Sequence, residues 1–192
     1  MKKLFLPVAL LGSFLIVSLT HAGSDHEKTI KIFKESPVVN PFFSNSYGYA
    51  VFPTIGKGGI GVGGAHGSGK VYAGGKVTGD TSMTQLTIGF QLGGQAFSQI
   101  IFFKDERAYK EFTSGEFEFG AQASAVAITA GAQAKAGTGG STAGATTKGD
   151  AGSQAKVDYQ KGMVVFTHAK GGLMYEASLG GQAFSFKPIK KK

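Results

Sequence analysis

Residues 51–77 contain ten glycines, and this run constrains the fold of the chain more than any other feature. The run reads VFPTIGKGGIGVGGAHGSGKVYAGGKV, with an apolar start, a stop at Pro53 and then glycines alternating with β-forming residues. A strand with one face stripped of side chains bends sharply or lets another backbone approach closely. We therefore predict a curved, glycine-rich β-hairpin here.

The same glycines also fit the spacing of a phosphate-binding loop, which is the main functional alternative. Gly56, Gly58 and Gly61 match the G-x-G-x-x-G pattern. However, Val71 stands where a Walker loop carries the hydroxyl that holds Mg²⁺, and the segment VYAGGKV that follows is typical of a strand, whereas such a loop opens a helix. The structural interpretation is preferred.

The run and its continuation resemble a SYLF domain. The resemblance rests on AVFPTIGKGGIGVGGAHGSGKVY, then GGKVTGDTSMTQLTIGFQLGGQAFSQIIFF, then a late GLM segment, and it extends from about Phe42 to the C-terminus. It implies a lipid-binding module, because the family binds membrane lipids, including phosphoinositides in eukaryotic members. It also raises actin, which a yeast member binds.

The first 22 residues predict an export signal. Lys2 and Lys3 form a basic start, an apolar run follows, and the small-residue end at Ala22 is compatible with cleavage. An uncleaved membrane anchor is the alternative. We expect a single domain over residues 23–192, periplasmic or secreted and possibly membrane-associated. Actin and phosphoinositides are cytosolic eukaryotic partners, so an exported chain makes both doubtful and favours bacterial anionic phospholipid.

The chain is basic, with 20 Lys and Arg against 12 Asp and Glu. Removal of the signal takes away two lysines and leaves a formal charge of +6. Such a charge suits anionic surfaces such as phospholipid headgroups, although it is equally compatible with simple solubility. We expect no nucleic-acid partner.

Residues 24–49 predict a helical N-terminal part. Its first helix would start at Ser24 or Asp25, and its apolar side would carry Ile30 and Phe33. Lysines recur on it at intervals of three: Lys28, Lys31 and Lys34. This helix could lay Ile30 and Phe33 on a membrane or dock them on the core of the domain.

The remaining chain predicts mainly antiparallel strands. Residues 82–92 alternate apolar and polar side chains, Gly79-Asp80 and Gly93-Gly94 are expected turns, and residues 95–103 return as a hairpin. LGGQAFS occurs at 92–98 and again at 179–185, which predicts related places in one sheet. The fold class is α+β, with a curved, sandwich-like or barrel-like sheet carrying two or three short helices.

Three further segments are predicted between these strands. Residues 105–114 predict a helix that begins at Asp105 and ends at Gly115. Residues 117–127 alternate and predict a long strand. Residues 137–153 contain only small and polar side chains, apart from Lys148 and Asp150, and predict a flexible loop.

The sequence carries no catalytic or metal-binding signature. Cysteine is absent, which excludes disulfides and thiolate metal sites, and neither G-x-S-x-G nor H-E-x-x-H occurs. We expect neither an enzyme nor a cofactor. His66 and Lys70 are interpreted as a turn that could bind a phosphate.

The sequence thus predicts a non-catalytic module that binds anionic phospholipid at a membrane surface. The candidate headgroup-binding residues are Lys28, Lys31, Lys34, Lys57, His66, Lys70 and Lys76. The candidate membrane-inserting residues are Ile30 and Phe33. The alternatives are a protein-binding or structural factor of the cell envelope and, less favoured, a small outer-membrane barrel.

Overall fold

The computed structural model describes residues 19–60, 62–88, 95–120, 123, 126–129, 132–135, 158–170 and 179–190. These residues form an α+β fold, as predicted. The helices are α1 (Leu19–Glu35), α2 (Asn40–Asn45) and α3 (Glu106–Phe112). The strands are β1 (Gly48–Ile60), β2 (Val62–Ala73), β3 (Lys76–Ile88), β4 (Gln95–Phe103), β5 (Glu116–Glu118), β6 (Val126–Thr129), β7 (Ala132–Lys135), β8 (Met163–Lys170) and β9 (Gln182–Pro188).

All strands belong to one sheet in the order β5-β9-β3-β2-β1-β4-β8-β6-β7. The strands from β5 to β8 are joined by antiparallel pairs, while β6 adds to β8 in parallel. The glycine-rich run forms β1, β2 and the start of β3, so the hairpin interpretation is confirmed and the phosphate-loop alternative fails. The sheet is open and is not closed into a barrel.

The β2–β3 turn lies at Gly74 and Gly75, not at the predicted Gly79-Asp80. Both turn glycines have positive φ, +57° and +74°, which is the backbone that a two-residue hairpin loop requires. Gly79 and Asp80 lie inside β3, paired with β9. The β2–β3 register excludes a turn at Gly79-Asp80, because these two residues pair with Val71 and Lys70 inside the ladder.

The predicted hairpin of residues 82–92 and 95–103 is wrong in its pairing. β3 pairs with β2 and β9, whereas β4 pairs with β1 and β8. The expected turn at Gly93-Gly94 lies outside the described residues. The alternation of apolar and polar residues predicts a strand, but it does not identify the strands with which that strand pairs.

The LGGQAFS repeat does mark related places. β4 begins at Gln95 and β9 begins at Gln182, the same position of the repeat, and the two strands flank the β1–β2–β3 meander on its opposite sides. Phe97 and Phe184 are equivalent in the repeat, and both are buried in one core cluster.

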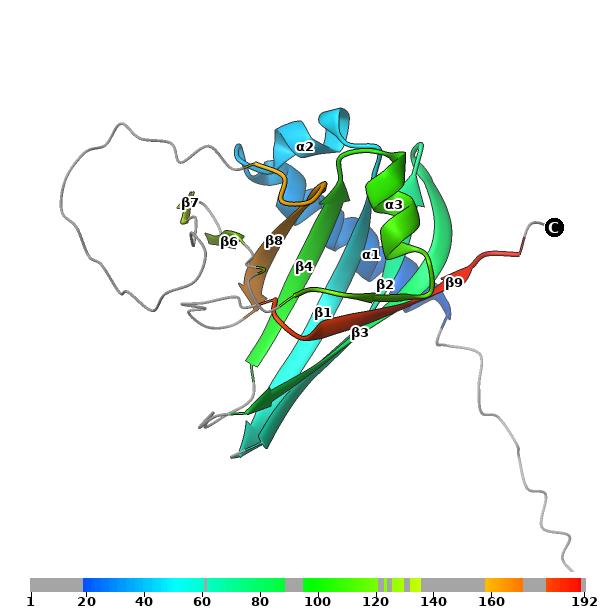
Figure 1. The fold of residues 1–192 in the computed structure, drawn as a ribbon. Coiled ribbons are helices and arrows are strands. Elements are labelled where there is room, and N and C mark those ends of the chain that lie inside the picture. Colours follow the sequence, from blue (N-terminus) through cyan, green and yellow to red (C-terminus); the bar gives the residue numbers. More distant parts are fainter. Residues whose placement is uncertain are drawn as a thin grey trace, which may run out of the picture.

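The sheet curls so strongly that strands far apart in its order meet. Figure 1 shows β9 crossing in front of β1 and β3, with α1 behind the sheet. The rings of Phe52 on β1 and Phe184 on β9 lie 5.6 Å apart between centroids. We call the side of the sheet that carries these two rings the concave face and the opposite side, which α1 covers, the convex face.

Glycines on the concave face make this curvature possible. A Cβ on Gly69 would lie 2.6 Å from the Val51 carbonyl oxygen and 2.7 Å from the Phe52 ring, and one on Gly67 would lie 2.6 Å from Ile55. The side chains of Phe52 and Ile55 therefore pack directly against the backbone of Gly69 and Gly67. This is the close approach that the glycine pattern predicted.

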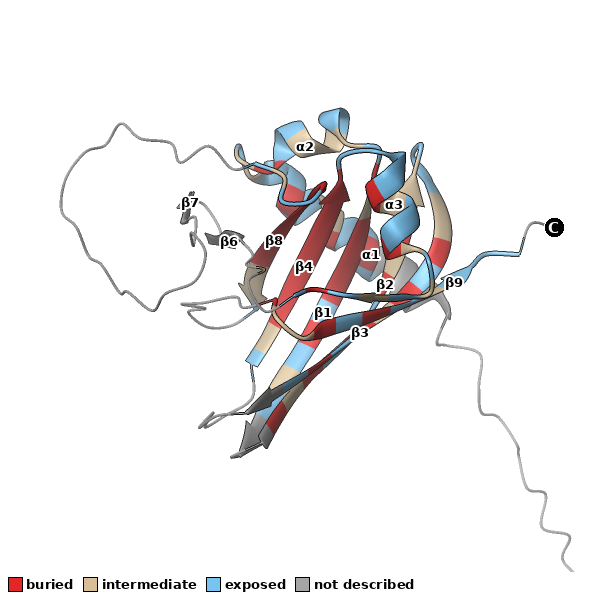
Figure 2. Cartoon of the chain, in the orientation of Figure 1, coloured by how far each residue is buried: buried red, intermediate tan, exposed pale blue. Residues whose placement is uncertain are grey.

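Burial is concentrated in the upper parts of β1, β4 and β8, between the two faces (Figure 2). The concave cluster includes Phe103, Phe112 of α3 and Phe184, and the convex cluster joins Phe33 of α1 to Phe102 and Phe166. Both faces are thus filled by the side chains of the domain itself.

The helix predicted at 105–114 is confirmed as α3. The Asp105 side chain caps it by accepting a hydrogen bond of 2.9 Å from the Ala108 N–H. The long strand predicted at 117–127 is wrong. β5 ends at Glu118, the Ala123 N–H donates to the Gly120 carbonyl as in a turn, and β6 begins at Val126 beside β8, on the other side of the sheet. The loop predicted at 137–153 lies outside the described residues.

Candidate functional site

The predicted headgroup-binding residues do not form one cluster. They lie in three places: three lysines on α1, a second set along β1 and β2, and Lys76 at the start of β3. Of the helices formed by the described residues, none is long and apolar enough to cross a bilayer. The described His, Asp and Glu side chains do not gather into groups of three that could hold a metal ion.

Helix α1 docks on the sheet, and this contradicts the membrane-inserting role predicted for Ile30 and Phe33. Phe33 is 0% exposed and packs with Val51 and Phe102 on the convex face, and Ile30 is partly buried against the same cluster. Insertion of these side chains would require α1 to leave the core. The docking alternative accounts for them.

Helix α1 also begins earlier than predicted, at Leu19 in place of Ser24 or Asp25. The start of the helix therefore overlaps the last residues of the predicted signal, whose first 18 residues lie outside the described part of the chain.

The charges on α1 balance. Its three lysines are exposed, but exposed carboxylates precede and follow them at Asp25, Glu27 and Glu35. The Lys28 ammonium lies 3.9 Å from the Asp25 carboxylate, and the Lys34 ammonium lies 5.2 Å from the centre of the Phe43 ring. Over residues 25–35 the formal charge is therefore zero with histidine neutral, so this helix is not a basic surface.

His66 and Lys57 lie on opposite faces of the sheet. His66 is in the middle of β2, not in a turn as predicted, and its Nδ1 lies 3.3 Å from Thr84 Oγ1 on β3. Lys57 pairs in register with Ala65, which belongs to the concave cluster. The two cations cannot hold one phosphate between them.

Lys70 and Lys76 belong to a group of lysines that the sequence separates widely. β9 runs beside β3 with Asp80 opposite Lys187, and Asp80 is also opposite Lys70 on β2. The chain then continues past Pro188 along β3. We call this part of the surface the basic corner: Lys70, Lys76, Lys187 and Lys190.

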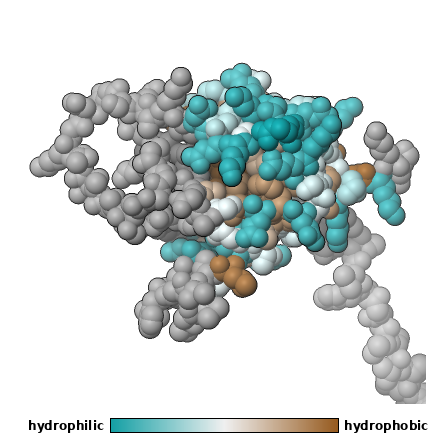
Figure 3. Space-filling view, viewed as in Figure 1, coloured by the Kyte–Doolittle hydropathy of each residue, from teal (hydrophilic) through white to brown (hydrophobic). Residues whose placement is uncertain are grey.

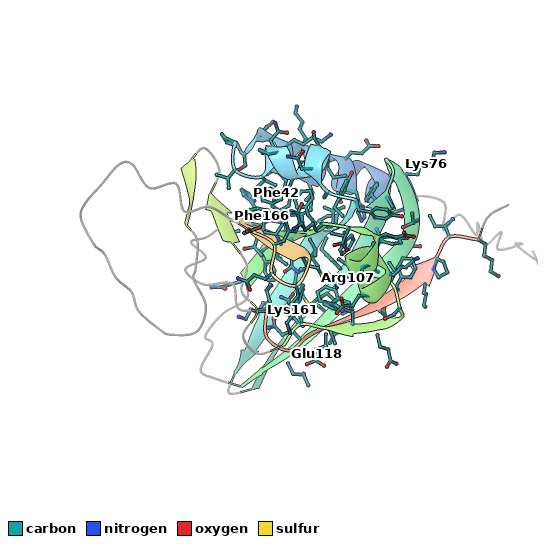
Figure 4. The ribbon with its side chains drawn as sticks, turned by 45° about the horizontal axis from the view of Figure 1, so that its top comes forward. Phe42, Lys76, Arg107, Glu118, Lys161 and Phe166 are labelled. Atoms are coloured by element: carbon teal, nitrogen blue, oxygen red, sulfur yellow. The ribbon has the colours of Figure 1, made fainter. Side chains whose placement is uncertain are left out.

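The corner is fixed by backbone hydrogen bonds. The Ile189 N–H donates to the Thr78 carbonyl over 3.0 Å, which holds the C-terminal segment two residues from Lys76. Figure 4 shows Lys76 at the end of the β2–β3 hairpin, on the side of the molecule where β9 leaves the sheet. The sequence signal for this site is a basic tail, the lysines at 187 and 190–192 that follow the second LGGQAFS copy. The sequence alone does not show that this segment pairs with β3.

Two described acids, Asp80 and Glu27, lie at or beside the corner. The Asp80 carboxylate lies 3.9 Å from the Lys70 ammonium. Burial, and then the nearby Glu27 carboxylate, raise the pKa of the Tyr72 phenol, which places Glu27 at the border of the corner. Lys76, Lys187 and Lys190 are exposed and form no ion pair within the described part of the chain.

An apolar side chain stands among these lysines. Ile189 is 48% exposed, between Pro188 and Lys190. In Figure 3 hydrophilic residues cover the upper part of the visible face, a tan area of moderate hydrophobicity lies in its centre, and the most strongly hydrophobic residues lie at its lower and right margins. Ile189, next to Lys190, is therefore an exposed apolar side chain within a basic segment of the chain.

Comparison with known families gives a match over the C-terminal part of the chain. The model of a family described as Ysc84: Las17-binding protein actin regulator matches residues 84–188. The match begins in β3 and includes β4, α3 and β9, and it is narrower than the resemblance in the sequence, which starts near Phe42. No curated protein matches the chain.

Proposed function

The chain belongs to the Ysc84 family, the SYLF domains, and from that premise we propose that it is a non-catalytic module that binds anionic phospholipid at a membrane surface. The family is consistent with binding of lipid or of actin regulators in general. The choice of anionic lipid comes from the charge of this chain.

One observation carries the proposal: exposed ammonium groups remain without carboxylate partners. Ion pairs engage Lys28, Lys70 and Lys110. The exposed Lys76, Lys187 and Lys190 have none within the described residues. A lysine near an anionic bilayer contributes about 1 kcal/mol, so a few such groups suffice for reversible adsorption.

The binding mode that fits this surface is adsorption without an internal lipid pocket. The concave side is filled by aromatic rings from β1, β4, α3 and β9, with centroid distances such as 5.0 Å for Phe103 and Phe112 and 5.1 Å for Phe112 and Phe184. An acyl chain would have to displace these rings. Headgroup contact at the surface displaces only water and counterions.

The test is co-sedimentation of the full-length protein, and of the form that begins at Gly23, with neutral and with anionic phospholipid vesicles at low and high salt. We expect binding to anionic vesicles that weakens as salt screens the charges. Binding to neutral and anionic vesicles alike would contradict the electrostatic mechanism. Failure to bind either would overturn the proposal.

We also propose that the protein is exported and acts in the cell envelope, which the basic and apolar start of the sequence supports. The measurement is the N-terminal sequence and intact mass of protein recovered from the producing cell. Cleavage after Ala22 would leave Gly23 as the first residue. A cytoplasmic protein with the intact N-terminus would contradict export.

A protein partner is the second candidate, favoured by the description of the family as Las17-binding and actin-regulating. An exported chain would meet an envelope protein and not actin. Crosslinking to a defined partner in the absence of lipid, combined with no vesicle binding, would place this candidate first.

A further inference from the structure

We infer that the protein meets the bilayer with the basic corner, the part of the sheet formed by the β2–β3 hairpin and the end of β9, and not with α1. The inference rests on the proposed function and adds the site and the orientation of the bound domain. It follows from strand register, from the distribution of charge and from the position of one exposed isoleucine.

Strand pairing gathers the corner from two distant parts of the chain. Lys70 and Lys187 both lie beside Asp80, and Lys76 lies two residues from Thr78, whose carbonyl accepts the Ile189 N–H. The turn glycines Gly74 and Gly75 carry no side chains that could cover Lys76. The lysines are therefore presented on a hydrogen-bonded scaffold and not on a frayed terminus.

The sign of the local charge distinguishes the corner from α1. Among the described residues the corner carries four lysines against two carboxylates, those of Asp80 and of the bordering Glu27. On α1 the charges of three lysines are balanced by those of three carboxylates. An anionic surface is attracted to the first arrangement and gains little from the second.

Ile189 identifies the occupant as a bilayer and not as a soluble polyanion. Ile189 is 48% exposed next to Lys190, in a segment that is held by the hydrogen bond to the Thr78 carbonyl. Lysine can keep its ammonium at headgroup level while an adjacent apolar side chain enters the interface. A dissolved phosphate or glycan would use the lysines but would give Ile189 no partner.

Two variants with the same change in charge test the inference. The corner variant carries Lys76→Gln, Lys187→Gln and Lys190→Gln, and the helix variant carries Lys28→Gln, Lys31→Gln and Lys34→Gln. All six lysines are exposed, so both variants should fold, and their circular dichroism and thermal unfolding serve as the check. Partitioning onto anionic vesicles is then measured for both and for the unsubstituted protein.

We expect the corner variant to lose about a hundredfold in partition coefficient, because each lysine at an anionic bilayer contributes about fivefold. The helix variant should lose less than about threefold. Loss in the helix variant alone, or equal loss in both, would overturn the inference while leaving lipid binding intact. Failure of the unsubstituted protein to bind any vesicle would instead overturn the proposed function.

Competition separates the bilayer from dissolved anions. Inorganic phosphate and a water-soluble phospholipid headgroup are added to vesicle-bound protein at matched ionic strength. We expect no more release than sodium chloride produces at the same ionic strength. Complete release by the headgroup at low concentration would show a pocket for the free anion and would overturn a surface contact.

Discussion

At the scale of single residues, the concave face depends on positions where any side chain would collide with its neighbours. Gly69 lies under the Phe52 ring and against the Val51 carbonyl, and Gly79 lies under Phe186. Gly56, in the same hairpin, has nothing within 4 Å of the place where a Cβ would stand. The glycine pattern therefore mixes essential and replaceable positions.

Gly69→Ala should destabilise the fold by about 1–3 kcal/mol, the usual cost of forcing an extra carbon into a packed interior. The measurement is the free energy of unfolding in urea. The matched control is Gly56→Ala, which should be neutral or slightly stabilising, since alanine loses less backbone entropy than glycine in a strand. Equal effects of both substitutions would contradict the close approach at Gly69.

Tyr49 should give the protein an alkaline limit of stability. Burial, followed by the neighbouring Tyr72, raises the pKa of the Tyr49 phenol from about 10 to about 12. The folded state therefore prefers the neutral phenol, so the stability linked to Tyr49 is present below pH 10 and is lost as pH rises from 10 towards 12. Urea unfolding across this range should show the fall, and Tyr49→Phe should reduce it. An unchanged slope in Tyr49→Phe would argue against this origin.

At the scale of elements, β9 is the strand that gives the sheet its curl. It pairs with β3, yet its Gln182 meets Gln99 of β4 across the concave side. The Gln99 Nε2–H donates to the side-chain Oε1 of Gln182 over 3.0 Å, and the Gln182 Nε2–H donates to Gln99 Oε1 over 3.4 Å. Both side chains are buried, so each satisfies the other where water is excluded.

Gln182→Leu should destabilise the protein by about 1–3 kcal/mol, because it leaves the Gln99 amide buried without this partner. The double variant Gln99→Leu with Gln182→Leu should recover part of that loss, since removing both polar partners leaves neither unsatisfied. Urea unfolding of the two single variants and the double variant measures the coupling. Additive effects of the two substitutions would show that the pair does not hold β9 against β4.

Local elements were predictable from the sequence where local chemistry decides them. The Asp105 cap of α3 and the alternation in β3 and β4 needed no distant information. The pairing of β3 with β9 depends on a segment about a hundred residues away, which local patterns do not reveal. The sequence-based prediction therefore put a turn at Gly79 and paired β3 with β4, and both were wrong. Docking of Phe33 could not be decided either, because an apolar helix side suits a core and a membrane equally.

At the scale of the whole molecule, the fold decides where the excess positive charge is presented. The sequence supplied Lys70 and Lys76 as candidates, and it supplied a basic tail, but only the β3–β9 register brings these together. It also supplied Lys28, Lys31 and Lys34, whose positive charge is balanced by the neighbouring carboxylates of α1. A candidate site could thus be predicted residue by residue, whereas its assembly required the tertiary structure.

Orientation on the membrane is the most direct consequence of the basic corner. The chain contains no tryptophan, so a single introduced tryptophan reports its own surroundings. Three exposed apolar residues mark three parts of the surface: Ile189 at the corner, 48% exposed, Ile32 on α1, 37% exposed, and Leu86 near the end of β3, 79% exposed. Their exposure makes replacement by tryptophan tolerable.

The decisive measurement is the fluorescence of Ile189→Trp, Ile32→Trp and Leu86→Trp on anionic vesicles whose acyl chains carry bromine. We predict that the emission of the tryptophan at 189 shifts to the blue and is quenched by the bromine, while the tryptophans at 32 and 86 keep the emission they show in water. A blue shift and quenching at position 32, with no change at 189, would contradict the account and place the membrane contact on α1.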